Sequence, residues 1–160
     1  MKNLLTSLVL FASLTLGMAS CDKGNDPTSF TENGNSNVTT TSPTGSKMKI
    51  TIGSAIFTAT LYDNPSVTAF KTRLPLAINM EDLNANEKFY YFSSNLPTSA
   101  VVGRNIQVGD LMLYGNNCLV LFYKGFNTSY SYTKLGKIDD VAGLVSALGV
   151  GNVTIKFENN

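Results

Sequence analysis

Histidine and tryptophan are absent from this chain of 160 residues, and cysteine occurs only twice. Histidine is the commonest general base in enzymes and a frequent zinc ligand, so most hydrolase triads and zinc sites are excluded. Cys118 lies in the apolar run of residues 118–123, which predicts a small buried thiol; a disulfide between two chains is the alternative. We expect no metal or other cofactor, and assign no catalytic residue.

Charge of either sign is also scarce. Charged residues make up 14% of the chain, and the formal net charge is +1. A surface that binds nucleic acid normally carries a cluster of basic side chains, whereas the lysines and arginines here are scattered among acids. The composition therefore predicts no nucleic-acid partner.

Long apolar runs are missing as well. The apolar stretch from Leu4 to Leu16 follows the positive charge of Lys2 and is interrupted by serine and threonine. A membrane-spanning helix needs ~20 predominantly apolar residues, so this stretch is too short and too polar to be one. It is typical of a secretory signal peptide, which we place at residues 1–20.

Cys21 follows the small-residue run that ends the predicted signal. Met18, Ala19, Ser20 and Cys21 resemble the bacterial lipobox, in which the cysteine thiol is alkylated by a diacylglycerol and the signal is cut before it. The resemblance implies lipidation at Cys21, export, and anchoring to a membrane of the bacterial cell envelope, with membrane lipid as the partner. Two or three acyl chains anchor a protein firmly in a membrane, since each buried CH₂ contributes ~0.8 kcal/mol. The alternative is an ordinary signal peptide cut after Ala19 or Ser20.

Residues 21–46 are almost entirely Asp, Asn, Gly, Ser, Thr and Pro, and Phe30 and Val38 are their only large apolar residues. Such a segment cannot bury a core, so it predicts a flexible linker with a reach of roughly 25–30 Å. The remaining residues, 47–160, are enough for one domain with its own hydrophobic core.

Period-two alternation dominates this domain. Residues 47–52 and 55–61 alternate around Gly53 and Ser54 and predict a hairpin. Asn64 and Pro65 predict the start of a helix over about residues 65–73. Asp139 or Asp140 is expected to cap a second helix over residues 141–148. Further strands are expected at residues 76–80, 89–92, 108–114, 118–124, 132–138 and 153–157.

These expected elements define the fold class. Many short strands with two short helices favour a mostly β domain in which the sheet closes, or nearly closes, into a β-barrel and the helices cover its ends.

Two sequence motifs inside this domain carry no chemistry. Ser131–Lys134 matches S-x-x-K on an expected strand, which sends the two side chains to opposite faces. Asp82, Asn84 and Asn86 begin like a calcium loop but lack its glycine, and are interpreted as a polar turn.

Four segments carry a resemblance to a known family: MKITIGSAIFTATLYDNPSVTAF, GDLMLYGNNCLVLFYKGF, YTKLGKIDD and NVTIKFE. Together they are similar to the cyclophilin-like fold proteins of bacteria and archaea, over nearly all of residues 47–158. The resemblance implies a compact β-barrel with two helices. Members of that family are not, as a class, established prolyl isomerases.

Cyclophilin catalysis depends on an arginine on the strand after the first helix, and residues 76–80 contain none. The only arginines are Arg73, at the expected helix end, and Arg104, in an expected glycine-rich loop. Either could reach a pocket from another strand. Weak peptidyl-prolyl isomerisation therefore remains the alternative to a binding function.

Aromatic residues are concentrated between residues 114 and 132. Tyrosine and phenylalanine beside asparagine suit a surface that binds a peptide or small ligand, although aromatic residues on strands also fill cores. We expect the strand positions to be core, and the residues of expected loops, Phe126 and Tyr130, to contribute to a site. The candidate ligand-binding residues are Tyr114, Asn117, Phe126, Tyr130, Arg73 and Arg104.

Overall fold

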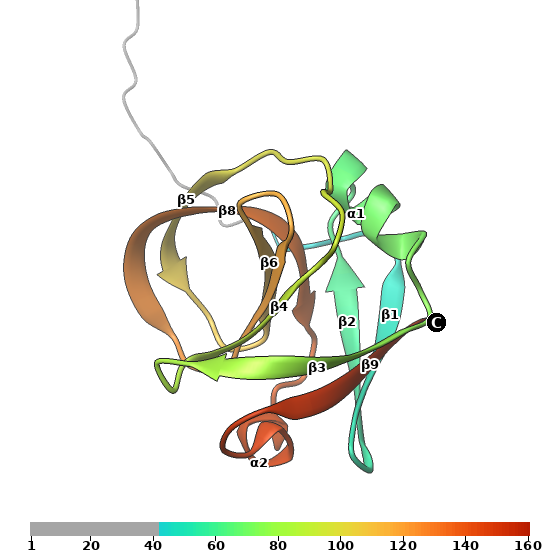
Figure 1. Cartoon of the computed structure of the whole chain (residues 1–160), viewed down its shortest axis with the longest axis vertical. Coiled ribbons are helices and arrows are strands. Elements are labelled where there is room, and N and C mark those ends of the chain that lie inside the picture. Colours follow the sequence, from blue (N-terminus) through green and yellow to red (C-terminus); the bar gives the residue numbers. More distant parts are fainter. Residues whose placement is uncertain (1–41) are drawn as a thin grey trace, which may run out of the picture. The chain divides into compact units, whose positions relative to one another are not determined.

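The computed structural model describes residues 42–160 (Figure 1). Cys21, the predicted signal peptide and most of the predicted linker lie outside the described residues. The elements are β1 (Lys47–Ile52), β2 (Ala55–Leu61), α1 (Pro65–Lys71), β3 (Leu76–Leu83), β4 (Glu87–Tyr91), β5 (Val101–Ile106), β6 (Asp110–Tyr114), β7 (Cys118–Phe122), β8 (Phe126–Ile138), α2 (Leu144–Leu148) and β9 (Val153–Asn159).

All the strands belong to one antiparallel sheet, in the order β2-β1-β9-β3-β4-β7-β6-β8-β5. An additional pairing between β2 and β8 brings the sheet back on itself, so the strands are arranged as a ring, and β5 is attached outside it through β8 (Figure 1). The expected mostly β fold with two short helices is thereby confirmed.

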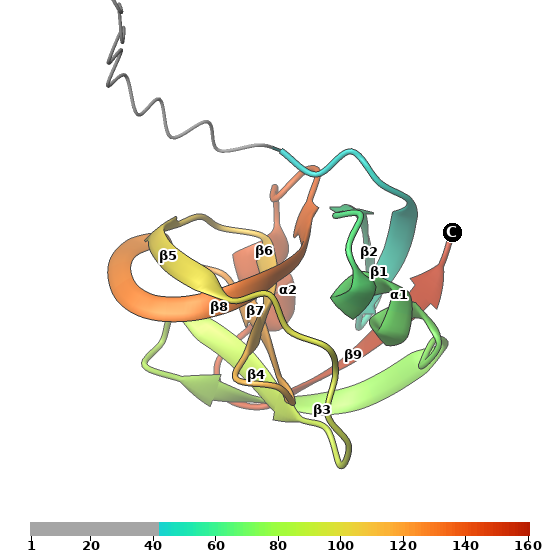
Figure 2. The same ribbon diagram turned by 90° about the horizontal axis from the view of Figure 1, so that it is seen from above.

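Alternating apolar residues explain why the ring has a core. Met48, Ile50 and Ile52 of β1 are at most 2% exposed, and Ile50 is paired with Phe57 across the predicted hairpin. Both helices add apolar side chains to this core, and they lie on opposite sides of the ring (Figure 1, Figure 2). None of the helices in residues 42–160 has the length and apolar character needed to span a membrane.

Helix α1 begins as its sequence predicts. The Asn64 side chain accepts a hydrogen bond from the backbone N–H of Val67 at 2.9 Å, and Pro65 occupies the first turn. Helix α2 begins later than predicted, at Leu144, because neither aspartate caps it: the Asp140 carboxylate accepts from Ala142 N–H, and Asp139 bonds Thr60 and Lys47. Its N-cap is Gly143, whose φ is 78°.

Two expected loops are strands, which corrects the sequence prediction. Arg104 lies in β5, and Phe126 and Tyr130 lie in β8, which runs for 13 residues. Strand β5 is an edge strand whose side chains are mostly exposed, so its sequence lacks the apolar alternation that reveals a half-buried strand. The first half of β8 pairs with this exposed strand and was missed for the same reason.

A second, smaller apolar cluster forms on the outer face of the ring. The first half of β8 curls away from the ring together with β5 (Figure 1, Figure 2). Side chains from β5 and β8 there pack against β6 and β7. The buried members are Ile106, Met112, Cys118, Val120, Phe122 and Tyr132, with Phe89 and Phe126 partly buried against them. This outer cluster, and not the main core, positions the site.

Candidate functional site

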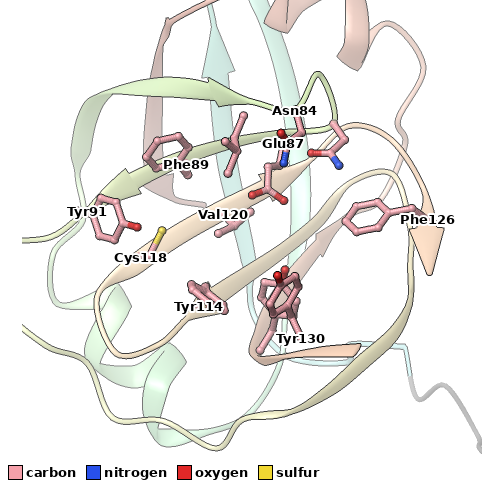
Figure 3. Close-up of a pocket in the computed structure, with 12 residues that line it drawn as sticks. Asn84, Glu87, Phe89, Tyr91, Tyr114, Cys118, Val120, Phe126 and Tyr130 are labelled. Atoms are coloured by element: carbon pink, nitrogen blue, oxygen red, sulfur yellow. The ribbon is translucent and has the colours of Figure 1, made fainter. Parts of the chain in front are cut away.

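A cavity of about 430 Å³ opens beside this outer cluster (Figure 3). Its size lies within the range of roughly 300–1,000 Å³ that is usual for small-molecule sites. We call it the outer pocket. The residues that line it are Leu83, Asn84, Asn86, Glu87, Phe89, Tyr91, Tyr114, Cys118, Val120, Phe126, Tyr130 and Tyr132.

Strand alternation decides which side chains reach the outer pocket. Successive residues of a strand point to opposite faces of the sheet, so Glu87, Phe89 and Tyr91 of β4 share the pocket face, while Lys88 points to the other face and is completely buried. On β7 the pocket side carries Cys118 and Val120 in the same way. The pocket therefore receives alternate residues of two neighbouring strands.

Cross-strand pairing arranges four of these residues in a row. Tyr91 of β4 is opposite Cys118 of β7, which is opposite Tyr114 of β6, which is opposite Tyr132 of β8. The side chains of directly opposed residues lie close together on one face. A hydrogen bond joins the Tyr91 hydroxyl to the Cys118 sulfur within this row.

Tyrosine rings form the rim of the pocket. Tyr91, Tyr114 and Tyr130 are 59%, 43% and 63% exposed, whereas Tyr132 is only 6% exposed and belongs to the floor. The Tyr114 ring packs on Tyr130 and Tyr132, with centroids 6.1 and 5.5 Å apart. Such contacts are favourable for aromatic pairs and hold the rings in place. The rim thus offers flat apolar surfaces tipped with hydroxyl groups.

The opposite end of the pocket is polar and comes from the turn between β3 and β4. Asn84 has a positive φ of 54°, and the backbone carbonyl of Asn86 accepts from the N–H groups of Tyr123 and Lys124, so the turn is held in place. The side-chain oxygen Oδ1 of Asn86 is buried and has no hydrogen-bond partner within residues 42–160. A buried unpaired acceptor costs stability, so it is a feature that needs an explanation.

Glu87 supplies the only carboxyl group among the lining residues. Burial raises the pKa of this carboxyl above its ordinary value. The lining residues include no lysine and no arginine, and none of the ion pairs in residues 42–160 involves Glu87. The polar end of the pocket is therefore acidic and lacks an internal counterion.

The thiol and the buried phenol of the pocket are neutral at physiological pH. Burial raises the pKa of Cys118 to about 11, and burial with the nearby Glu87 charge raises the pKa of Tyr132 to about 12. The negative charge that Cys118 would carry, together with burial, also raises the pKa of Tyr91. A thiol of this kind is a poor nucleophile, because only the thiolate reacts.

The structure brings three of the predicted site residues together and places the other three elsewhere. Tyr114, Phe126 and Tyr130 line the outer pocket. Asn117 does not line it; its side-chain amide donates to the carbonyl of Phe92 at 3.1 Å. The prediction that these residues bind a ligand stays a prediction.

Neither arginine lines the outer pocket. The Arg73 guanidinium donates to the carbonyls of Ser94 and Asn95 and lies 4.4 Å from the centroid of the Phe92 ring, so it braces the segment after β4. Arg104 is exposed on β5 with a φ of 54°, beside an irregularity in the pairing with β8. Neither side chain is thus among the residues that line the pocket.

Sequence reasoning missed Asn86, Glu87, Phe89 and Tyr91 as lining residues. Glu87 stands in the sequence where a calcium loop needs its glycine, and no group of metal-ligating side chains is present in the described part of the chain. A signal was available in the alternation of Glu87, Phe89 and Tyr91, which places a carboxylate and two rings on one strand face.

Comparison with known proteins identifies the class to which this fold belongs. The model of the cyclophilin-like family matches residues 50–158, so the chain belongs to the cyclophilin-like family. No curated protein matches the chain. The solution structure of a hypothetical protein from Archaeoglobus fulgidus is similar, with a TM-score of 0.54 and 16% sequence identity, over 72% of this chain and 95% of that one. At this identity the likeness concerns the fold.

Proposed function

We propose that this protein is a lipid-anchored binding module of the bacterial cell envelope, and that its outer pocket holds a peptide or small ligand. The observation that carries the binding function is the pocket itself, a cavity of about 430 Å³ with an aromatic rim and a polar end. Sites for small ligands commonly combine a largely apolar lining with a few placed polar groups.

The tyrosines of the rim suit this role. A tyrosine side chain offers a large flat contact area at a low cost in conformational entropy, and its hydroxyl can bond to a ligand. Tyr91, Tyr114 and Tyr130 are exposed although they are large and partly apolar. An exposed group of aromatic side chains around a cavity is more typical of a binding surface than of a core.

Nuclear magnetic resonance can test the pocket with peptides and small aromatic compounds. We expect the shift changes of a bound ligand to concentrate on Tyr114, Phe126 and Tyr130, and Tyr130→Ala to weaken binding at least several-fold. Ile56→Ala is the matched control, because Ile56 is 67% exposed on β2 and does not line the pocket. Shift changes that avoid the pocket residues would contradict the proposed site.

The anchor is proposed from the sequence. Cys21 follows a predicted signal and precedes a polar linker, an arrangement that displays a domain at some distance from a membrane. Cys21→Ser should move the protein from the membrane fraction to the soluble fraction of cells. Cys118→Ser, which removes the other thiol, should leave fractionation unchanged. Membrane association that persists in Cys21→Ser would argue against lipidation.

Weak prolyl isomerisation, the alternative from the sequence, has no specific observation in its favour. Neither Arg73 nor Arg104 is among the residues that line the outer pocket. A proline-peptide isomerisation assay separates the two functions directly. A rate enhancement that is lost when Arg73 or Arg104 is changed would show that the protein is a prolyl isomerase and not a binding module.

A further inference from the structure

We propose that the outer pocket selects ligands that carry a protonated amine, or another cationic group with N–H donors, attached to an apolar body. This inference rests on the binding function proposed above and specifies its ligand class. Three features of the pocket support it: a carboxylate without an ion-pair partner at one end, the absence of lysine and arginine from the lining residues, and walls made of aromatic rings.

The unpaired carboxylate is the first feature. Glu87 lines the polar end of the pocket and forms no ion pair in the described part of the chain. A carboxylate at one end of a cavity can be satisfied by a single ammonium group, which has three donors. The neighbouring Asn86 Oδ1 is buried and exposes almost no surface, so the carboxylate of Glu87 is the group that a ligand can reach.

The second feature is that no lysine or arginine side chain is among the residues that line this end. Lys88 is next to Glu87 in the chain, yet its ammonium points to the other face of β4, where it binds Asp82 at 2.5 Å and the carbonyl of Gly149 at 3.2 Å. The lining residues contain neither lysine nor arginine. The negative charge of the pocket is therefore left for a ligand to neutralise.

The aromatic walls are the third feature. Rings of Phe89, Tyr91, Tyr114, Phe126 and Tyr130 surround the cavity (Figure 3). The face of an aromatic ring carries partial negative charge and attracts a cation within about 6 Å, with a contribution of ~0.5–2 kcal/mol. The same rings accept the apolar body of the ligand. An anionic ligand meets a carboxylate and ring faces, so it is disfavoured by the same arrangement.

Protonation of Glu87 makes this selection depend on pH. The titratable side chains that face Glu87 from the surrounding elements are Tyr91, Tyr114, Cys118, Tyr123, Tyr130 and Tyr132. Cys118 has a pKa of about 11, and Tyr123 and Tyr132 have pKa values of about 12, so these groups stay neutral while Glu87 titrates. The charges of Asp82 and Lys88 neutralise each other on the opposite face. A cation favours the ionised carboxyl, so affinity should fall as the pH falls through the pKa of Glu87.

The test uses three probes with the same ring and different heads: phenethylamine, phenethyl alcohol and phenylacetate. Binding to the purified full chain is followed by nuclear magnetic resonance. We expect phenethylamine to bind about tenfold more tightly than the alcohol, or better, and phenylacetate to bind most weakly. Glu87→Gln should reduce the preference for the amine over the alcohol several-fold, to what the aromatic rings alone provide. Glu158→Gln is the control, since that carboxylate binds lysines outside the pocket.

The outcomes separate the two proposals. Equal affinity for the amine and the alcohol, with shift changes at the pocket residues, would overturn the cationic preference and leave the binding function intact. A preference for the amine that survives undiminished in Glu87→Gln would overturn the role of Glu87 in the selection. Failure of all three probes to shift any pocket residue would count against the binding function as well. An unchanged resonance pattern outside the pocket shows that Glu87→Gln is folded, because the substitution keeps the size of the side chain.

Discussion

Glu87 and Lys88 are consecutive in the chain but lie on opposite faces of β4, so their opposite charges never meet. Glu87 lines the outer pocket, whereas Lys88 is fully buried and binds Asp82 and two backbone carbonyls, those of Gly149 and Gly151. Lys88 therefore fixes the strand that carries Glu87 without neutralising it. The hairpin of β3 and β4 is held firmly on one face, and a free carboxylate is presented on the other.

Replacing Lys88 should destabilise the domain strongly. Lys88→Met leaves Asp82 without its ion-pair partner and two carbonyls without their donor, and breaking a buried ion pair from one side costs ~3–5 kcal/mol. Urea unfolding followed by circular dichroism measures the change in the free energy of unfolding. Lys156→Met is the control, because the Lys156 side chain is 50% exposed and should contribute little. Equal effects of the two variants would refute the structural role of Lys88.

Asp82 should contribute stability that is lost in acid. Its hydrogen bond with Lys88 and, to a smaller extent, its hydrogen bond with Tyr123 hold the pKa of Asp82 below its ordinary value of 3.8. The unfolded chain therefore binds a proton more readily than the folded chain, and the stabilisation is present above pH ~4 and lost as the pH falls through the folded pKa. We expect the difference in unfolding free energy between the wild type and Asp82→Asn to narrow from pH 5 towards pH 2. A constant difference would contradict the role of the carboxylate charge.

Glu87 should behave in the opposite way. Burial raises its pKa, so the folded protein binds this proton more tightly than the unfolded chain, and the stability that results is lost as the pH rises through the folded pKa. Glu87→Gln should therefore be more stable than the wild type at pH 7, and this advantage should disappear below pH ~4. Thermal unfolding across this pH range measures it. A variant less stable than the wild type at pH 7 would show that Glu87 is held by bonds to the folded protein.

Gly136 should be essential for closing the ring. A Cβ atom at this position would lie 2.8 Å from both the backbone oxygen of Thr60 and a methyl carbon of Leu61, where β8 meets β2. Overpacking of this kind costs ~1–3 kcal/mol. Gly136→Ala should lower the urea midpoint and speed amide exchange in β2, whereas Lys137→Ala, at the next position, should change both little. Unchanged exchange in β2 would mean that the added methyl group is accommodated between the two strands, against the prediction.

The Cys118 thiol should react slowly in the folded protein. Its pKa is raised from 9.0 to about 11, so the thiolate is about a hundredfold rarer near pH 8 than in the unfolded chain. Alkylation by iodoacetamide, measured by mass spectrometry in the Cys21→Ser background, should be at least a hundredfold slower in buffer than in urea. Comparable rates in the two conditions would show that the thiol is accessible and ionised.

The sequence predicts the parts of the fold in which local pattern and burial agree. The alternation around Gly53 marks β1 and β2, and Asn64 with Pro65 marks the start of α1, because each signal lies within a few residues. Strand β5 carries no such signal, since both of its faces are largely exposed. Its pairing with β8 depends on the curvature of β8, and no local sequence pattern predicts that curvature.

The site was predicted only in part for the same reason. Tyr114, Phe126 and Tyr130 are close in sequence, so their aromatic density could be noticed without a structure. Glu87 reaches the same cavity because β4 pairs with β7, and Asn86 because the preceding turn is bonded to the end of β7. These contacts join residues 35 to 38 positions apart, and periodicity within one strand cannot predict them.

Strand β9 lies between β1 and β3, and its residues pair with both the first and the third strand of the domain. The sheet therefore remains open, with two unpaired edges, until β9 has been synthesised. Folding has to wait for contacts between the two ends of the domain, and pairings over such sequence separations form slowly. Loss of β9, Val153–Asn159, would leave those edges free to pair with other chains, so termination before this strand should produce aggregates and not a smaller domain.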